Sequence, residues 1–127
     1  MSWIYKQSTG EFFDSQGKLV ATGYAGGNCG KNPEGINNHA MQNVKSVGPI
    51  PVGVYTHGDV VLESHLGAYA VPLIPDNANE MFGRGGFYMH GDKVSAPRCA
   101  SKGCIIMPRI IREAYYNSYD NVIEVVA

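Results

Sequence analysis

Apolar and polar residues at the start of the chain form three short runs divided by turn residues. The runs cover residues 3–7, 11–14 and 18–24, and the segments between them end in Gly10 and Gly17. Short runs rich in aromatic and β-branched residues, bounded by Ser, Thr and Gly, are typical of strands joined by tight turns. The pattern predicts an antiparallel meander of three strands.

Residues 25–46 have no hydrophobic period and are rich in glycine and asparagine. They predict a long loop with one helical turn within residues 39–44. Long loops in compact domains are usually functional, and we expect this one to wall a substrate cleft.

The rest of the chain predicts further short strands and one helix. The strands are expected at residues 52–56, 60–63, 67–73, 87–90 and 121–126, with turns at 57–59 and a helical turn within 75–81.

The helix is expected at residues 108–118, with Pro108 in its first turn. Its apolar stripe is expected to pack on the sheet and consists of Ile110, Ile111, Ala114, Tyr115 and Ser118.

Sixteen glycines and seven prolines in 127 residues favour many turns and little helix. We therefore predict a mostly β fold, a small β-sandwich or mixed sheet with long loops and the single C-terminal helix at about 108–118. The length predicts one domain, residues 1–127.

The charge balance excludes two classes of partner. Ten Lys and Arg against eleven Asp and Glu give a net charge of −1, which gives no electrostatic basis for binding nucleic acid or an anionic membrane. No apolar run approaches the roughly 20 residues that span a bilayer, and the N-terminus does not resemble a signal peptide. We expect a protein made in the cytoplasm without a signal peptide and without membrane insertion.

The candidate chemistry lies in two short motifs near the C-terminus. His90 ends an apolar run, and Cys104 follows it by fourteen residues, directly after Gly103. A thiol is a strong nucleophile only as the thiolate, and a neighbouring imidazole is the usual base that produces it. Gly103 allows a tight turn that exposes the sulfur and directs backbone N–H groups at a developing oxyanion. The pair predicts a thiol enzyme.

Other uses of these residues fit less well. In papain-like enzymes the Cys precedes the His, and the sequence around the caspase nucleophile is absent. A zinc deaminase needs the motifs His-x-Glu and Cys-x-x-Cys. In this chain His90 is followed by Gly-Asp, and Cys99 and Cys104 are separated by four residues, so neither motif is present. We therefore expect no metal and no cofactor. His39, His57 and His65 are interpreted as solvated or structural residues, and Cys29 and Cys99 either form a disulfide or remain free thiols.

These motifs resemble a known family. His90-Gly91, then Ser101-x-Gly103-Cys104, and upstream Pro51-x-Gly53-x-Tyr55 are similar to the motifs of L,D-transpeptidases, cysteine enzymes that act on the stem peptides of bacterial peptidoglycan. The chain is most similar to the short type VI secretion effectors built on this motif. The resemblance implies that Cys104 forms an acyl-enzyme, that His90 is its base and that the carbonyl of Gly91 orients the imidazole.

The resemblance also implies a reaction at the bond after diaminopimelate. Water as acceptor gives L,D-carboxypeptidase activity, and an amine gives L,D-transpeptidation. The family usually has a His before Gly-Cys and an Arg two residues after the Cys, where this chain has Lys102 and Ile106. Candidates for substrate binding, including a replacement cation, are Tyr88, Arg98, Ser101, Lys102 and Arg109.

For partners and location, the resemblance implies delivery by a secretion-system carrier to the periplasm of a target bacterium, and a periplasmic immunity protein in the producer. Two alternatives stay open, a non-catalytic cell-wall-binding module of the same fold and a housekeeping or phage enzyme that modifies the wall.

Overall fold

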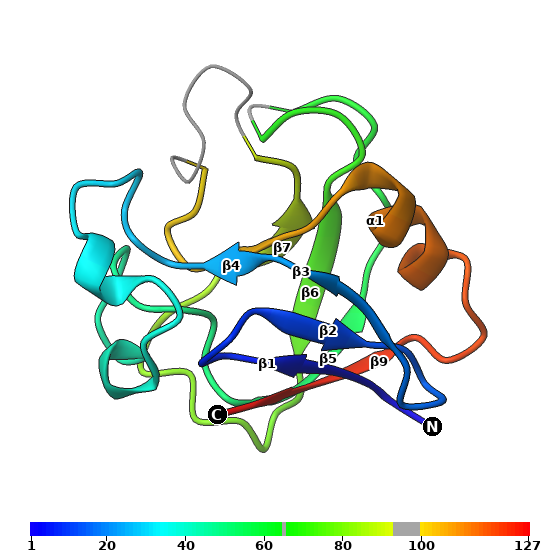
Figure 1. The fold of residues 1–127 in the computed structure, drawn as a ribbon, viewed down its shortest axis with the longest axis horizontal. Coiled ribbons are helices and arrows are strands. Elements are labelled where there is room, and N and C mark those ends of the chain that lie inside the picture. Colours follow the sequence, from blue (N-terminus) through cyan, green and yellow to red (C-terminus); the bar gives the residue numbers. More distant parts are fainter. Residues whose placement is uncertain (65, 93–99) are drawn as a thin grey trace.

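The computed structural model describes residues 1–64, 66–92 and 100–127, and its fold is mostly β (Figure 1). The strands are β1 (Trp3–Lys6), β2 (Glu11–Phe13), β3 (Leu19–Thr22), β4 (Tyr24–Ala25), β5 (Gly53–His57), β6 (Val71–Pro75), β7 (Tyr88–His90), β8 (Ile105–Ile106) and β9 (Val122–Val126). The helical elements are the 3₁₀ turns η1 (Pro33–Gly35) and η2 (His39–Met41) and the helix α1 (Arg109–Tyr116). Within the described part of the chain, no helix is long and apolar enough to cross a bilayer.

All nine strands belong to one sheet in the order β3-β2-β1-β9-β5-β6-β7-β8-β4. The predicted meander is confirmed, because β1 pairs with β2 and β2 with β3 in antiparallel register. Two pairs of neighbouring strands are parallel, β1 with β9 and β7 with β8. The predicted mixed sheet is therefore confirmed, with a single curled sheet in place of a two-sheet sandwich.

The two edges of the sheet meet through a single glycine. Strands β3 and β4 lie at opposite ends of the strand order, yet only Gly23 separates them in the chain. A Cβ atom on Gly23 would lie 1.8 Å from the carbonyl oxygen of Ile106, so only glycine permits this approach. The sheet is consequently nearly closed.

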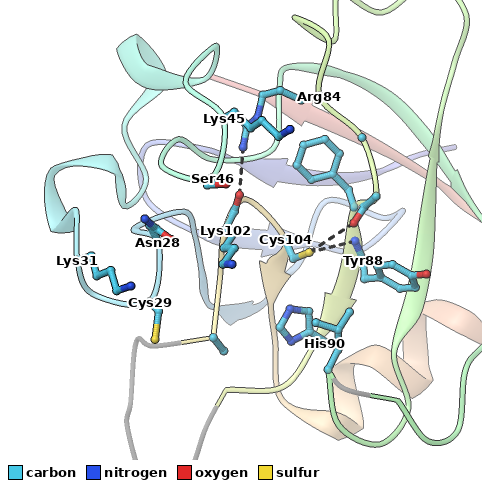
Figure 2. Close-up of a pocket in the computed structure, with 15 residues that line it drawn as sticks. Asn28, Cys29, Lys31, Lys45, Ser46, Arg84, Tyr88, His90, Lys102 and Cys104 are labelled. Carbon is cyan, nitrogen blue, oxygen red and sulfur yellow. Dashed lines mark hydrogen bonds between the residues drawn. The ribbon is translucent and has the colours of Figure 1, made fainter.

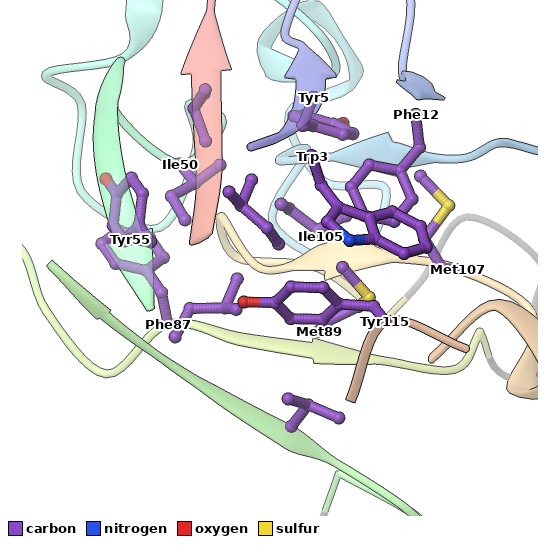
Figure 3. Packing of buried hydrophobic residues seen from close by; sticks show 14 of the residues in the cluster. Trp3, Tyr5, Phe12, Ile50, Tyr55, Phe87, Met89, Ile105, Met107 and Tyr115 are labelled. Carbon is purple, nitrogen blue, oxygen red and sulfur yellow. The ribbon is translucent and has the colours of Figure 1, made fainter. Parts of the chain in front are cut away.

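The core fills the inside of the curled sheet (Figure 3). Along β1, Trp3 and Tyr5 point inward and Lys6 is exposed, as a period of two requires. Trp3 stacks on Phe12 at a centroid distance of 5.1 Å and meets Tyr115 of α1 edge-on at 5.6 Å. These ring contacts attach the helix to the N-terminal meander.

Two of the predicted strands differ from the structure. Residues 60–63 form no strand and contribute only one bridge, Val61 to Ala70. The strand predicted at 67–73 begins later, at Val71. Tyr69 has a left-handed backbone (φ 59°), and this conformation interrupts an extended run.

Two predicted turns are also wrong. Residues 75–81 are not helical. His57, predicted in a turn, is the last residue of β5 and pairs with Leu73 of β6. The strand β5 therefore extends one residue further than its sequence pattern indicated.

The helix is confirmed over Arg109–Tyr116, but its buried face differs from the predicted stripe. Ile110 is 72% exposed and Ala114 is also exposed, whereas Arg112 and Tyr115 are buried. Arg112 satisfies its guanidinium with backbone carbonyls, donating to Met107 O, Tyr69 O at 3.1 Å and Ala68 O at 3.3 Å. A buried arginine therefore takes the place that the sequence pattern gave to isoleucine.

Candidate active site

The candidate nucleophile and base come from neighbouring parallel strands. Met89 of β7 pairs with Ile105 of β8, and His90 pairs with Ile106. Met89 and Ile105 face the core, so the alternating residues His90 and Cys104 belong to the opposite face. Cys104 directly precedes β8, opposite Tyr88, and the backbone N–H of Tyr88 donates to Cys104 Sγ at 3.3 Å. Cys104 and His90 are therefore diagonal neighbours on one face of this strand pair, because His90 pairs with Ile106, two residues after Cys104.

Both side chains line one pocket of about 770 Å³ (Figure 2). The loop predicted to wall a cleft forms part of it through Asn28, Cys29, Lys31, Lys45 and Ser46. The other side comes from Arg84–Tyr88, and Lys102 and Ala100 also take part. A pocket of this size is within the range of sites that bind small molecules.

His90 is oriented by the backbone of the residue that follows it. Its Nδ1 lies 3.0 Å from the carbonyl oxygen of Gly91, as the family resemblance implies. A carbonyl oxygen can only accept, so this contact assigns the proton to Nδ1 and makes Nε2 the basic nitrogen of the neutral ring. The N–H of Met107 donates to His90 O at 3.0 Å and fixes the end of β7.

Cys104 is half-buried, and burial raises the pKa of its thiol. Three contacts oppose this rise in pKa: the backbone N–H groups of Tyr88 and of Cys104 itself, and the nearby charge of Arg84. Burial has the larger effect, so the resting side chain is a neutral thiol at neutral pH. A nucleophile in this state needs a base that removes its proton during attack.

Ser101, predicted to bind substrate, is instead completely buried. Its Oγ accepts from the N–H of Gly26 at 2.8 Å and of Gly103 at 3.0 Å, and donates to the carbonyl of Cys104 at 2.7 Å. These bonds use the one donor and both acceptor sites of the hydroxyl, and they hold the turn before Cys104 against the start of the long loop. The prediction for Ser101 is corrected: its contacts are structural.

Gly103 has a conformation that a side chain would disturb. Its φ is +135°, and a Cβ there would lie 2.6 Å from Arg84 Nη2 and 2.7 Å from Phe87 Cε1. Its N–H donates to Ser101 Oγ, so this amide is turned away from the pocket. Of the backbone N–H groups expected to face an oxyanion in this turn, that of Gly103 is therefore already bound within the turn.

Arg84 is a site residue that the sequence patterns did not indicate. It is 7% exposed, its guanidinium lies 5.2 Å from the centroid of the Phe87 ring, and it contributes to the pocket wall. Its terminal nitrogens donate to four backbone carbonyls, those of Gln42, Gly48, Pro49 and Lys102. An arginine between glycines is typical of an exposed turn, so residue type gives no signal of this burial.

The other predicted cations have different positions. Lys102 is exposed and lines the pocket beside Cys104. Arg109 is absent from its lining; it pairs with Glu113 at 2.9 Å and stacks on Tyr69 at 4.8 Å. Arg98 lies outside the described residues. Tyr88, another candidate for substrate binding, is half-buried and lines the pocket.

The remaining described histidines and cysteines have packing, hydrogen-bonding or disulfide contacts. His57 packs on Tyr115 and Tyr116 at 5.3 and 4.7 Å, in agreement with a structural role. His39 is exposed, as expected for a solvated residue, and its Nδ1 contacts Gln7 Oε1 at 2.6 Å. Cys104 is a free cysteine and Cys29 is disulfide-bonded. Cys99 and His65 lie outside the described residues. Among the residues that are described, no three His, Cys, Asp or Glu side chains converge on a metal-sized site.

Two comparisons with known proteins bear on this site. The sequence model of the Tlde1 domain matches residues 24–126, which span β4 to β9 and contain the whole pocket lining. Only β1–β3 of the meander fall outside the match. No curated protein sequence matches the chain.

Proposed function

The chain belongs to the Tlde1 domain family of type VI secretion effectors, and from this premise we propose that it is a cysteine enzyme acting on peptidoglycan stem peptides. The bond that it cleaves or exchanges is the amide after diaminopimelate, which makes it an L,D-carboxypeptidase or L,D-transpeptidase. The observation that carries the proposal is the arrangement of Cys104 and His90 on one face of neighbouring strands, inside one pocket.

Acylation begins with proton transfer within this pair. Nε2 of His90 takes the thiol proton as Cys104 Sγ attacks the carbonyl carbon of the substrate. The same proton then passes to the leaving amine, the carbon–nitrogen bond breaks, and the peptide remains on sulfur as a thioester. The bond from Nδ1 to Gly91 O supports this role because it holds the ring in the tautomer that has a basic Nε2.

The negative charge on the substrate oxygen needs donors beside the sulfur. The N–H groups of Tyr88 and Cys104 are the candidates, because both act on the thiol and lower its pKa. Donors already directed at the place where charge develops stabilise the transition state without reorganisation. We assign the oxyanion to these two amides.

The acceptor determines the product. Water that gives its proton to His90 Nε2 attacks the thioester and releases the peptide as a carboxylic acid. An amine in the same position forms a new amide and releases an exchanged peptide. In both cases the thiol of Cys104 is regenerated.

The test uses purified disaccharide tetrapeptide and mass spectrometry. The protein is expected to produce the disaccharide tripeptide, or an exchanged tetrapeptide when a D-amino acid is added. Cys104→Ala and His90→Gln are expected to lose product by at least about a thousandfold, since nucleophile and base act as a unit. His57→Gln is the matched control, because it alters the other His-Gly-Asp sequence, which lies outside the pocket lining.

Two outcomes would contradict the proposal. Tetrapeptide that binds but is never converted, with variants that fold normally by circular dichroism, would support a non-catalytic wall-binding module. Product formation that survives Cys104→Ala would remove the thiol from the mechanism.

We also propose where the reaction occurs and what restrains it. The effector family suggests delivery into the periplasm of a target bacterium, and a producer that makes such an enzyme needs a periplasmic immunity protein. Expression with an added periplasmic export signal is expected to cause swelling or lysis, whereas cytoplasmic expression or exported Cys104→Ala is expected to be harmless. Equal toxicity of the Cys104→Ala protein would contradict this proposal.

A further inference from the structure

The pocket concentrates positive charge in a protein whose net charge is −1. Four of the ten Lys and Arg residues line it, namely Lys31, Lys45, Arg84 and Lys102. None of its described lining residues is Asp or Glu. A concave surface lined by one sign of charge focuses the field and raises the local concentration of oppositely charged ligands.

The buried and exposed cations differ in what they offer a ligand. Arg84 has four donor contacts with backbone carbonyls, so it supplies mainly charge. Lys31, Lys45 and Lys102 are exposed at the pocket. The ion pairs found in the described part of the chain involve other residues, Met1 with Asp120 and Arg109 with Glu113.

The three lysines come from two segments of the chain that both line the pocket containing Cys104. Lys31 and Lys45 belong to the long loop, and Lys102 precedes Cys104 by two residues. Figure 2 shows Lys31 on the wall opposite Tyr88, with Lys102 and Cys104 between them. A peptide that reaches Cys104 therefore passes lysine ammonium groups on the loop side.

We propose that Lys31, Lys45 and Lys102 determine specificity by binding carboxylates of the acyl donor, so that the site selects peptides with a free C-terminal carboxylate. This inference rests on the proposed function, because it concerns the same pocket and substrate. A stem peptide with a free C-terminus carries a carboxylate on the residue that leaves, whereas a stem joined through that residue carries an amide. The lysines favour trimming of free stems over cleavage of cross-links.

Binding is measured without turnover in the Cys104→Ala protein. The probes are a synthetic tetrapeptide stem with a free C-terminal carboxylate and the same peptide with a C-terminal amide. Charge-assisted hydrogen bonds are stronger than neutral ones, and the acid is expected to bind about tenfold more tightly than the amide. Adding Lys31→Gln, Lys45→Gln or Lys102→Gln is expected to reduce this ratio about threefold each, and raising the salt concentration is expected to reduce it further.

Lys18→Gln is the matched control, because Lys18 is an exposed lysine between β2 and β3 and is absent from the pocket lining. It is expected to leave the acid-to-amide ratio unchanged. In the active enzyme, the pocket variants are expected to raise KM for the acid while kcat stays within about twofold. A Cys104→Ser background repeats the binding measurement if Cys104→Ala does not fold.

The outcomes separate this inference from the proposed function. Equal affinity for acid and amide, or an equal loss in Lys18→Gln, would overturn the lysine inference even if tripeptide product forms. If the acid binds more tightly than the amide but the protein never produces tripeptide, the lysine inference is supported and the enzymatic proposal is overturned.

Discussion

The hydroxyl of Ser101 donates to the carbonyl oxygen of Cys104 at 2.7 Å and closes a four-residue turn that ends at Cys104. The same hydroxyl oxygen accepts from the N–H groups of Gly26 and Gly103. One buried hydroxyl thus connects the turn that ends at Cys104 to the long loop that walls the pocket. The position of the thiol depends on a residue that has no contact with solvent.

Ser101→Ala is expected to destabilise the fold by about 2–4 kcal/mol, because it leaves two buried N–H groups without their acceptor. The measurement is the free energy of unfolding from urea titration. Ser8→Ala provides the control, since Ser8 is exposed in the turn after β1, and it is expected to cost less than about 0.5 kcal/mol. A Ser101→Ala protein as stable as the Ser8→Ala protein would contradict the structural role.

Gly103→Ala is expected to damage both stability and activity. The new methyl group would collide with Arg84 and Phe87 in a backbone conformation that disfavours side chains, at a cost of about 2–4 kcal/mol. Gly85→Ala is a matched control in the same pocket, because no atom lies within 4 Å of the place its methyl group would take and its φ is not left-handed. Unfolding titrations and product assays on both variants check the prediction, and similar losses in both would refute it.

Two buried tyrosines are expected to respond in opposite directions to removal of the hydroxyl. Within residues 1–64, 66–92 and 100–127, Tyr5 Oη has no hydrogen-bond partner, whereas Tyr55 Oη donates to Pro51 O at 2.7 Å. Tyr5→Phe is expected to raise the free energy of unfolding by about 1 kcal/mol, and Tyr55→Phe to lower it by about 1 kcal/mol. Urea titrations of the pair provide the measurement, and a destabilised Tyr5→Phe protein would contradict the assignment.

The reactivity of Cys104 is expected to increase with pH well beyond neutrality. Burial raises the pKa of this thiol, so a smaller fraction is thiolate at pH 7 than in an unperturbed cysteine. Alkylation by iodoacetamide, followed at the Cys104 peptide by mass spectrometry, is expected to be slow at pH 7 and to accelerate on alkaline titration. A thiol that reacts fully at pH 6 would indicate a resting thiolate and would exclude the neutral-thiol mechanism.

Part of the local structure around the candidate site could be predicted from the sequence. His90 at the end of an apolar strand and Cys104 after a glycine were sufficient to place both at strand ends, and parallel pairing of β7 with β8 joins them. That pairing could not be predicted, because strand neighbours depend on the whole sheet. Likewise, the β1–β9 pair joins the two ends of the chain, and no local pattern encodes it.

The features that the sequence did not predict depend on contacts that leave no local pattern. Arg84 and Arg112 are both buried, yet a charged side chain predicts exposure unless its partners are known. Their partners are backbone carbonyls, which every residue has and which therefore leave no mark in the sequence. Residues 60–63 include the β-branched Val60 and Val61, which favour a strand. Pairing is nevertheless limited to one bridge, Val61 with Ala70, because the left-handed backbone at Tyr69 ends the extended segment opposite.

The pairing of β1 with β9 has a kinetic consequence. Trp3 lies opposite Ile123, so two segments that are 120 positions apart in the sequence must meet before these neighbouring strands can pair. Contacts this distant in sequence slow folding, because the entropy of closing the loop is lost before the pairing compensates for it. On the ribosome, β1 has no β9 neighbour until residues 122–126 have left the exit tunnel, so the N-terminal strands wait for almost the whole domain before the sheet can be completed.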